Sequence, residues 1–126
     1  MTGIPPGIFS LADHALHASQ VLDANAQAYF NGGAADEITL RENLQAWQRL
    51  RLATRVLQPL AGGHTRVHLL GRTLAHPILV APMAHQRLAH PDGERATALA
   101  AAALGAGLVL STQASTPLED AARLVL

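Results

Sequence analysis

The sequence of 126 residues contains no cysteine and no lysine. The absence of cysteine excludes disulfides, thiolate nucleophiles and thiolate metal sites. All nine basic residues are arginines, so no lysine is present to form a Schiff base or to anchor a phosphate group. Chemistry that depends on either residue type is therefore excluded for this stretch of chain.

An excess of charge and long apolar runs are also missing. Nine acidic residues balance the nine arginines, which excludes the basic surface typical of a nucleic-acid-binding protein. The longest apolar run, residues 98–110, is shorter than the roughly 18 residues of a membrane-spanning helix. Residues 1–7 lack the pattern of an export signal. Since apolar residues make up 49% of the chain, we expect a folded cytoplasmic protein, outside the membrane, with no nucleic-acid partner.

The first half of the sequence predicts two helices after a disordered segment, residues 1–9. Apolar residues recur every three or four positions, which predicts one helix that Ser10 caps and Gly32-Gly33 ends in a left-handed stop. A Thr39-x-x-Glu42 capping box predicts a second helix over residues 40–50. The apolar stripe of the first helix consists of Leu11, Ala15, Ala18, Leu22, Ala26 and Tyr29. The expected buried face of the second helix consists of Leu40, Leu44, Trp47 and Leu50.

The period then changes from helical to extended. Residues 51–57 and 65–70 are expected to be extended, and Gly71-Arg72 predicts a turn into a short β-hairpin with Thr73-Leu74. The apolar run at residues 77–82 lies between prolines and is typical of a buried parallel strand.

The last fifty or so residues predict the order strand, helix, strand, helix. Pro91 is expected to open an alanine-rich helix, with Asp92 and Glu94 favouring its dipole and Gly105 ending it. A second strand over residues 108–111 precedes a helix with a Thr116-Pro117-x-Glu capping box. Such alternation implies parallel strands in an unfinished α/β domain. We divide the chain into residues 1–9, the helices and hairpin of 10–76, and two β/α units in 77–126.

Few residues are candidates for chemistry on position alone. Ser111 ends a predicted parallel strand, where α/β sheets bind ligands, although a plain strand-end hydroxyl is the alternative. Ala81-Pro82-Met83-Ala84 ends the preceding strand and either faces a flat ligand or simply terminates the strand. Tyr29 either donates to a carboxylate or packs with its hydroxyl in water.

Two other patterns lead to no site. The seven histidines do not converge as a metal site requires, so we expect no metal. Gly105-Ala106-Gly107 follows a helix and opens a strand, the reverse of a phosphate-binding loop, and is expected to be a connection.

Several blocks together resemble the N-terminal part of the FMN-dependent 2-hydroxy-acid oxidase and dehydrogenase family, in order and spacing. Glycolate oxidase, lactate oxidase and mandelate dehydrogenase are familiar members. The blocks are Tyr29–Ala34 with Asp36, Thr39-Leu40 and Glu42-Asn43, then Thr54–Leu57, Leu70-Gly71, Pro77–Pro82, Leu88–Glu94 and Leu110–Thr112.

The resemblance implies a (β/α)8 TIM barrel, of which this chain is a truncated part, with FMN at the carboxyl ends of its strands. It implies that Pro82, Met83 and Ala84 place backbone against the flavin ring and that Ser111 bonds its polar edge. Tyr29 would bind the carboxylate of a small 2-hydroxy acid and Gln113 would lie near that substrate. The implied reaction oxidises an (S)-2-hydroxy acid to the 2-oxo acid by hydride transfer to flavin N5.

The chain also departs from the family. Met83 replaces a frequent threonine, and Phe30 replaces a frequent second tyrosine. The family's histidine base, substrate arginines, flavin lysine and phosphate loops come from later strands, so no catalytic residue is expected here. The implied partner is a further copy, since members often form tetramers, or a complementary C-terminal chain. The alternatives are a non-catalytic truncated pseudoenzyme and a free-standing α/β ligand-binding domain.

Overall fold

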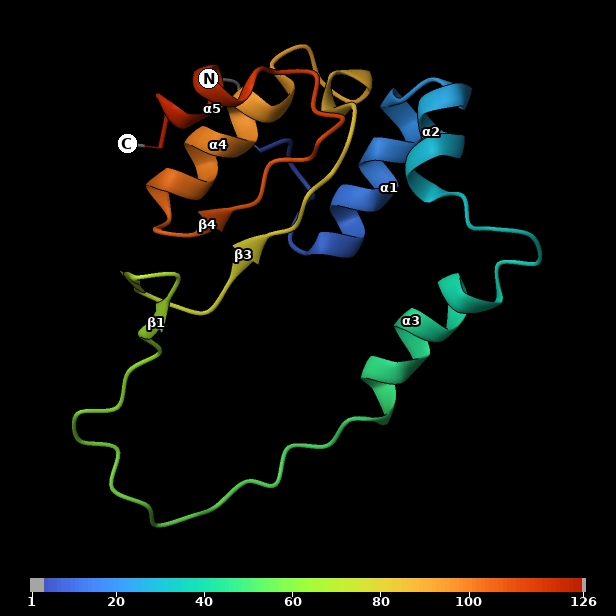
Figure 1. Cartoon of the computed structure of the whole chain (residues 1–126). Helices are drawn as coiled ribbons and strands as arrows, with labels where there is room; N and C mark the ends of the chain where they lie inside the picture. The colour runs from blue at the N-terminus through green and yellow to red at the C-terminus, as the bar shows by residue number, and fades with distance from the viewer. Residues whose placement is uncertain (1–3, 126) are drawn as a thin grey trace. The chain divides into compact units, whose positions relative to one another are not determined.

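The computed structural model of the chain describes residues 4–125 (Figure 1). These residues form two units, one within Met1–Arg55 and the other within Val56–Leu126. The predicted segment boundaries stay predictions. Residues 1–3 of the segment expected to be disordered lie outside the described residues, and residues 4–9 contain turns and loop without helix or strand.

The first unit begins with two helices where the apolar stripe predicts one. Helix α1 spans Leu11–Val21 and helix α2 spans Ala24–Asn31. The single-helix prediction is wrong because Asp23 caps a new helix, accepting a hydrogen bond from Ala26 N at 2.9 Å. The Gln27 side chain then donates to the carbonyls of Ser19 and Leu22, at 2.9 and 2.7 Å, and so satisfies the end of α1.

The predicted ends of this helical segment are correct, but one of the reasons is not. Ser10 caps α1 in a reciprocal capping box with Asp13. Hydrogen bonds from the Phe9 amide, then from Ser10, hold the pKa of Asp13 below its ordinary value. Gly32 ends α2 with an ordinary φ of −76°, not the left-handed stop. Glycine is favoured there because an added Cβ would lie 2.5 Å from the carbonyl oxygen of Ala28.

Helix α3 spans Ile38–Arg49 and starts before the predicted cap. The Thr39 capping box is wrong, since Glu37 precedes the helix in a left-handed conformation with φ of +56°. Its carboxylate accepts a hydrogen bond from Gly33 N at 3.0 Å. The predicted apolar stripe is present on α3, but its expected burial is wrong, because Leu44 and Trp47 are 70% and 75% exposed.

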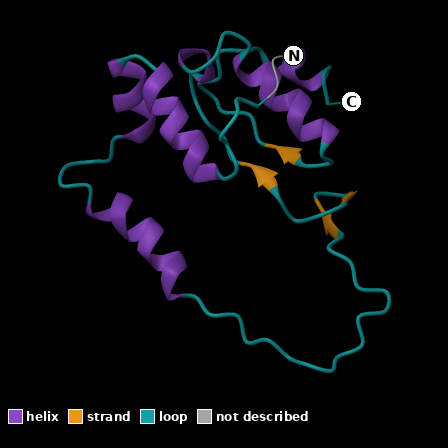
Figure 2. Ribbon diagram, turned by 180° about the vertical axis from the view of Figure 1, so that it is seen from behind, coloured by secondary structure: helices purple, strands orange, loops and turns teal. Residues whose placement is uncertain are grey.

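Residues 50–66 contain no helix or strand, seen as a continuous loop in Figure 2. The prediction of an extended piece over residues 51–57 therefore yields no strand. After this loop, β1 (Val67–Leu69) and β2 (Arg72–Leu74) form the predicted antiparallel hairpin, with Val67 opposite Leu74. The predicted turn position, Gly71-Arg72, is wrong by one residue: the turn is Leu70-Gly71, because Arg72 already pairs with Leu69.

The second unit then follows the predicted strand and helix order. Strand β3 pairs in parallel with β4, with Leu79 opposite Gly107. The predicted connection from α4 to β4 through Gly105, with φ of +68°, is confirmed. Pro91 does not open α4, which starts at Gly93, and β4 ends before the predicted residue 111. The elements after the hairpin are β3 (Leu79–Val80), the 3-10 helix η1 (Gln86–Leu88), α4 (Gly93–Ala103), β4 (Gly107–Leu108) and α5 (Leu118–Ala122).

The buried residues of this unit are of two kinds. The apolar ones are Ala98 and Ala101 of α4 and Ala121 of α5, and these two helices contact each other. The buried polar ones are Gln86, Glu94 and Thr116. Among residues 4–125, the structure holds no helix with the length and apolar character required to span a bilayer.

Candidate functional site

A buried carboxylate joins the two loops that follow the parallel strands. Glu94, in the first turn of α4, is 0% exposed. Its Oε1 atom accepts hydrogen bonds from Gln86 N at 3.2 Å and from Ser115 N at 2.9 Å. Its Oε2 atom accepts from Thr116 Oγ1 at 2.9 Å. Glu94 therefore binds the loop after β3 and the loop after β4 at the same time.

The sequence patterns assign different roles to these residues. Glu94 is expected to interact with the helix dipole, and Thr116 is expected to cap the last helix. The second expectation is wrong, because α5 has Pro117 before its first turn and no side-chain cap, while the Thr116 hydroxyl bonds Glu94. An acidic residue in a first helical turn is ordinary, so only the tertiary contact distinguishes Glu94.

The two loops also contact each other directly. His85 N donates to the carbonyl of Gln113 at 3.1 Å, and Gln86 Nε2 donates to the carbonyl of Met83 at 3.4 Å. The first bond joins the segment that contains Met83 to Gln113, whereas the second lies within the segment after β3. Ala84 lies between Met83 and His85 in the same loop and is partly buried.

Ser111 lines a hollow at the carboxyl end of β4. The hollow has a volume of about 490 Å³, and its walls are formed by Leu110, Ser111, Thr112, Ala114, Ser115, Thr116, Pro117 and Leu118. The Ser111 oxygen accepts a hydrogen bond from Gln113 N at 3.1 Å. Because the oxygen is the acceptor in this bond, the hydroxyl proton can be donated to a ligand. Pro82 is exposed at the start of the facing loop.

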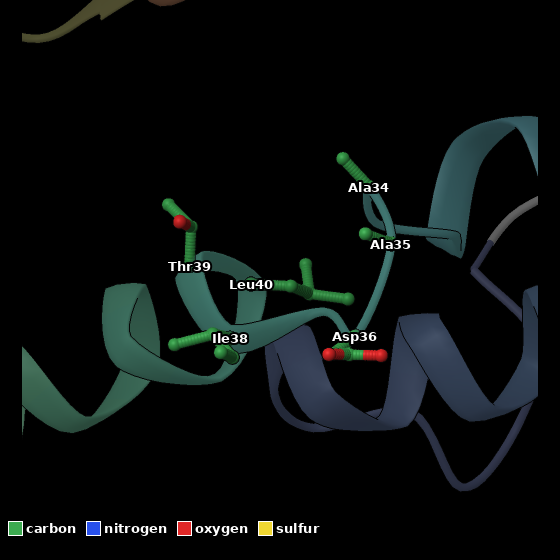
Figure 3. Close-up of a pocket in the computed structure, with 6 residues that line it drawn as sticks. All are labelled: Ala34, Ala35, Asp36, Ile38, Thr39 and Leu40. Atoms are coloured by element: carbon green, nitrogen blue, oxygen red, sulfur yellow. The ribbon is translucent and has the colours of Figure 1, made fainter.

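Tyr29 belongs to the other unit, in α2. Its side chain is 49% exposed, and its ring meets that of Phe30 edge-on with centroids 5.1 Å apart. The same unit has a second hollow, of about 250 Å³, in the connection from α2 to α3. Figure 3 shows Leu40 pointing from α3 toward the loop of Ala34 and Ala35 in this hollow. None of the predicted site residues lines it, so it is a weaker candidate site.

Among residues 4–125, no group of three or more histidine, aspartate or glutamate residues is arranged to hold an ion. Of the histidines, His76 bonds backbone groups through both ring nitrogens: Nε2 donates to the Leu104 carbonyl at 2.9 Å, and Nδ1 accepts from Ile78 N at 3.3 Å.

The electrostatics of Glu94 predict an acid-sensitive fold. Burial raises the pKa of the Glu94 carboxyl, but hydrogen bonds from Ser115, its own amide, Thr116 and Gln86 outweigh this effect and lower the pKa below 4.5. The Glu94 carboxyl therefore binds a proton more readily in the unfolded state than in the folded state. Its contribution to the free energy of unfolding is complete above the ordinary pKa of a glutamate and is lost as the pH falls through the lowered pKa.

We therefore expect the free energy of unfolding to decrease as the pH falls below about 5. Urea titrations followed by circular dichroism measure this change. The control is Glu94→Gln, which has no proton to bind at this position and leaves the acid dependence of the other carboxyl groups, such as Asp13. An equal acid dependence in Glu94→Gln and the parent chain would contradict the assignment.

Comparison with known proteins places these features in a wider context. The sequence profile of the FMN-dependent dehydrogenase family matches residues 18–125. The chain is 47% identical over 119 residues to an L-lactate oxidase of Alicycliphilus denitrificans, covering 94% of this chain and 33% of that protein. It is 38% identical over 117 residues to human 2-hydroxyacid oxidase 1, covering 93% and 32% of the two chains.

Solved structures agree with the sequence comparison. A crystal structure of mandelate oxidase matches with a TM-score of 0.88 and 37% identity over 93% of this chain and 34% of that one. The chain thus spans about a third of the length of the relatives it matches.

Proposed function

The chain belongs to the family of FMN-dependent dehydrogenases, and from this membership we propose that it forms two β/α units of a (β/α)8 barrel that oxidises an (S)-2-hydroxy acid to the 2-oxo acid. The names of the relatives, which include L-lactate, (S)-2-hydroxy-acid and mandelate oxidases, support this substrate class. The observation that carries the proposal is the bond from His85 N to the Gln113 carbonyl at 3.1 Å, which joins two loops at the carboxyl edge of parallel strands.

The residues at this edge fit FMN. Small and hydroxyl-bearing side chains line the 490 Å³ hollow, which suits a flat ring approached by backbone. Ser111 has a hydroxyl proton to donate to the polar edge of the flavin, because its oxygen already accepts from Gln113 N. The backbone of Pro82, Met83 and Ala84 would lie against the ring.

The remaining roles concern the substrate. When bound, FMN supplies the acceptor for the hydride that leaves the substrate carbon. Tyr29 would donate a hydrogen bond to the substrate carboxylate, and Gln113 would contact the substrate and influence which hydroxy acid is accepted. Assembly into a homo-oligomer or with a complementary C-terminal chain, and a cytoplasmic location, stay predictions.

The proposal predicts that these 126 residues alone do not turn over hydroxy acids. A general base contributes about 10²–10⁴ in rate, and the family's histidine base and phosphate-binding loops come from strands beyond the two β/α units. We expect the isolated chain to bind FMN weakly and to show no oxidation of L-lactate above buffer. Stoichiometric flavin and measurable oxidation by the isolated chain would contradict this expectation.

A hybrid protein tests the positive side of the proposal. In this hybrid, the chain replaces the matching segment of the Alicycliphilus denitrificans L-lactate oxidase, to which it is 47% identical. We expect the hybrid to bind FMN and oxidise L-lactate, and Ser111→Ala to weaken FMN binding about tenfold, as expected for one lost hydrogen bond. The control is Ser19→Ala, which removes an exposed hydroxyl from α1. A folded hybrid without flavin would reject the proposed function.

A further inference from the structure

Glu94 has an environment unusual for a carboxylate. It is completely buried, and the other two buried polar residues of residues 4–125, Gln86 and Thr116, both donate hydrogen bonds to it. Its partners from other segments are neutral donors: two backbone amides and one hydroxyl. Burying a charge without a cation is expensive unless hydrogen bonds compensate, so this arrangement calls for a reason beyond the stability of one helix.

The geometry shows which parts of the chain the carboxylate connects. One oxygen atom, Oε1, accepts from Gln86 N in the loop after β3 and from Ser115 N in the loop after β4. A shared acceptor sets the separation of its two donors, because each N–H···O bond has a narrow range of lengths. Glu94 therefore sets the distance between Gln86 N and Ser115 N, and with it the separation of the two loops.

From each donor, a short path leads to a predicted flavin contact. On one side, the Gln86 side chain donates to the carbonyl of Met83 at 3.4 Å, and Thr97 Oγ1 fixes that side chain by donating to its oxygen at 2.6 Å. On the other side, Ser115 lies four residues after Ser111, in the wall of the same hollow.

We propose that Glu94 is a positioning residue of the flavin site, which holds the Met83-Ala84 segment and the Ser111–Gln113 segment at a fixed separation. This inference rests on the proposed function, because it assigns the two segments to one ligand. A flat ring that contacts both segments requires them within about 0.5 Å of their productive places. Glutamate suits the task, since an ionised carboxylate accepts several hydrogen bonds at once.

Amide hydrogen exchange in the full chain tests the coupling without any flavin. The informative amide is His85 N, which donates to the Gln113 carbonyl and so reports directly on the contact between the two loops. We expect Glu94→Ala to accelerate its exchange about tenfold or more, because the loops separate more often. Glu94→Gln keeps an acceptor oxygen for the two amides, and its NH₂ group can donate to Thr116 Oγ1, so it should retain most of the protection.

Two further variants keep the test decisive. Thr116→Val removes only one donor and should give an intermediate acceleration, which replaces Glu94→Ala if that variant does not fold. Glu119→Gln removes an exposed first-turn glutamate from α5 and should leave the exchange of His85 N unchanged. Unchanged exchange of His85 N in folded Glu94→Ala, or in Thr116→Val when Glu94→Ala does not fold, overturns the proposal.

Flavin binding by the hybrid separates this inference from the proposed function. With FMN as the probe, Glu94→Ala should weaken binding about tenfold and Glu94→Gln should restore it. If Ser111→Ala weakens binding and Glu94→Ala does not, the function stands and the positioning role is rejected. If the folded hybrid binds no FMN at all, the proposed function fails, and the positioning role fails with it.

Discussion

Replacing Glu94 with alanine is expected to lower the free energy of unfolding of the Val56–Leu126 unit by about 3 kcal/mol or more. The substitution leaves the amides of Gln86 and Ser115 and the Thr116 hydroxyl without the carboxylate that accepts from them. Each buried donor that loses its acceptor costs about 1–3 kcal/mol. Since whole domains are stable by only about 5–15 kcal/mol, the loss would be a large fraction of the total.

Urea unfolding followed by far-ultraviolet circular dichroism measures this loss. The matched control is Glu119→Ala, at an exposed position in the first turn of α5, for which a change within about 0.5 kcal/mol is expected. Glu94→Gln should fall between the two, at about 1 kcal/mol, because the amide preserves most of the bonds. A change below about 1 kcal/mol in Glu94→Ala would mean that the three donors find other acceptors.

Gly93→Ala is expected to destabilise the same unit by about 2–4 kcal/mol, for two separable reasons. Gly93 has a left-handed φ of +46°, and an added Cβ would lie 2.9 Å from Arg87 Cγ and 3.2 Å from Arg87 N. The backbone conformation alone costs about 1 kcal/mol for a residue with a Cβ. The rest comes from crowding, since the Arg87 backbone must move and η1 is displaced with it.

Gly71→Ala separates the two contributions. Gly71 lies in the turn between β1 and β2 with φ of +74°, and an added Cβ there would meet no atom within 4 Å. Its substitution should therefore cost only about 1 kcal/mol, the part due to backbone strain. Equal losses of unfolding free energy in the two variants would show that Arg87 moves away at no cost and that crowding at Gly93 does not contribute.

Local patterns predict the order of elements in the second unit well. The hairpin follows from turn chemistry around Gly71, and the parallel pairing of β3 with β4 follows from two apolar runs separated by a helix. In both cases each element has its own local signal in the sequence. The strands themselves are shorter than the apolar runs, since β3 spans only Leu79–Val80 and β4 only Gly107–Leu108.

The predictions fail where a local sequence pattern is compatible with two different structures. The stripe through Leu22 is compatible with one helix or two, and only the Asp23 cap decides for two. Thr39 and Thr116 have the same capping-box signal, yet neither caps a helix. For Thr116 the physical reason is distant in the sequence, since its hydroxyl bonds Glu94 instead.

The candidate site is predicted in part for the same reason. The rule that ligands bind at the carboxyl ends of parallel strands selects Ser111 and Met83 from the sequence, and the structure joins their loops. Their roles, and those of Tyr29 and Gln113, stay predictions. Glu94 has no local signal, because a first-turn acid looks like any helix-dipole partner until the loop contacts are known.

The alanine interior of the second unit has a thermal consequence. The buried apolar side chains of this unit are those of Ala98, Ala101 and Ala121, and each contributes only a methyl group to the surface exposed on unfolding. The heat-capacity increment of unfolding scales with the apolar area that becomes hydrated. A small increment gives a broad, shallow dependence of stability on temperature, with weak cold denaturation. We therefore expect the stability of this unit to vary less with temperature than that of a unit of equal length whose buried apolar side chains are large.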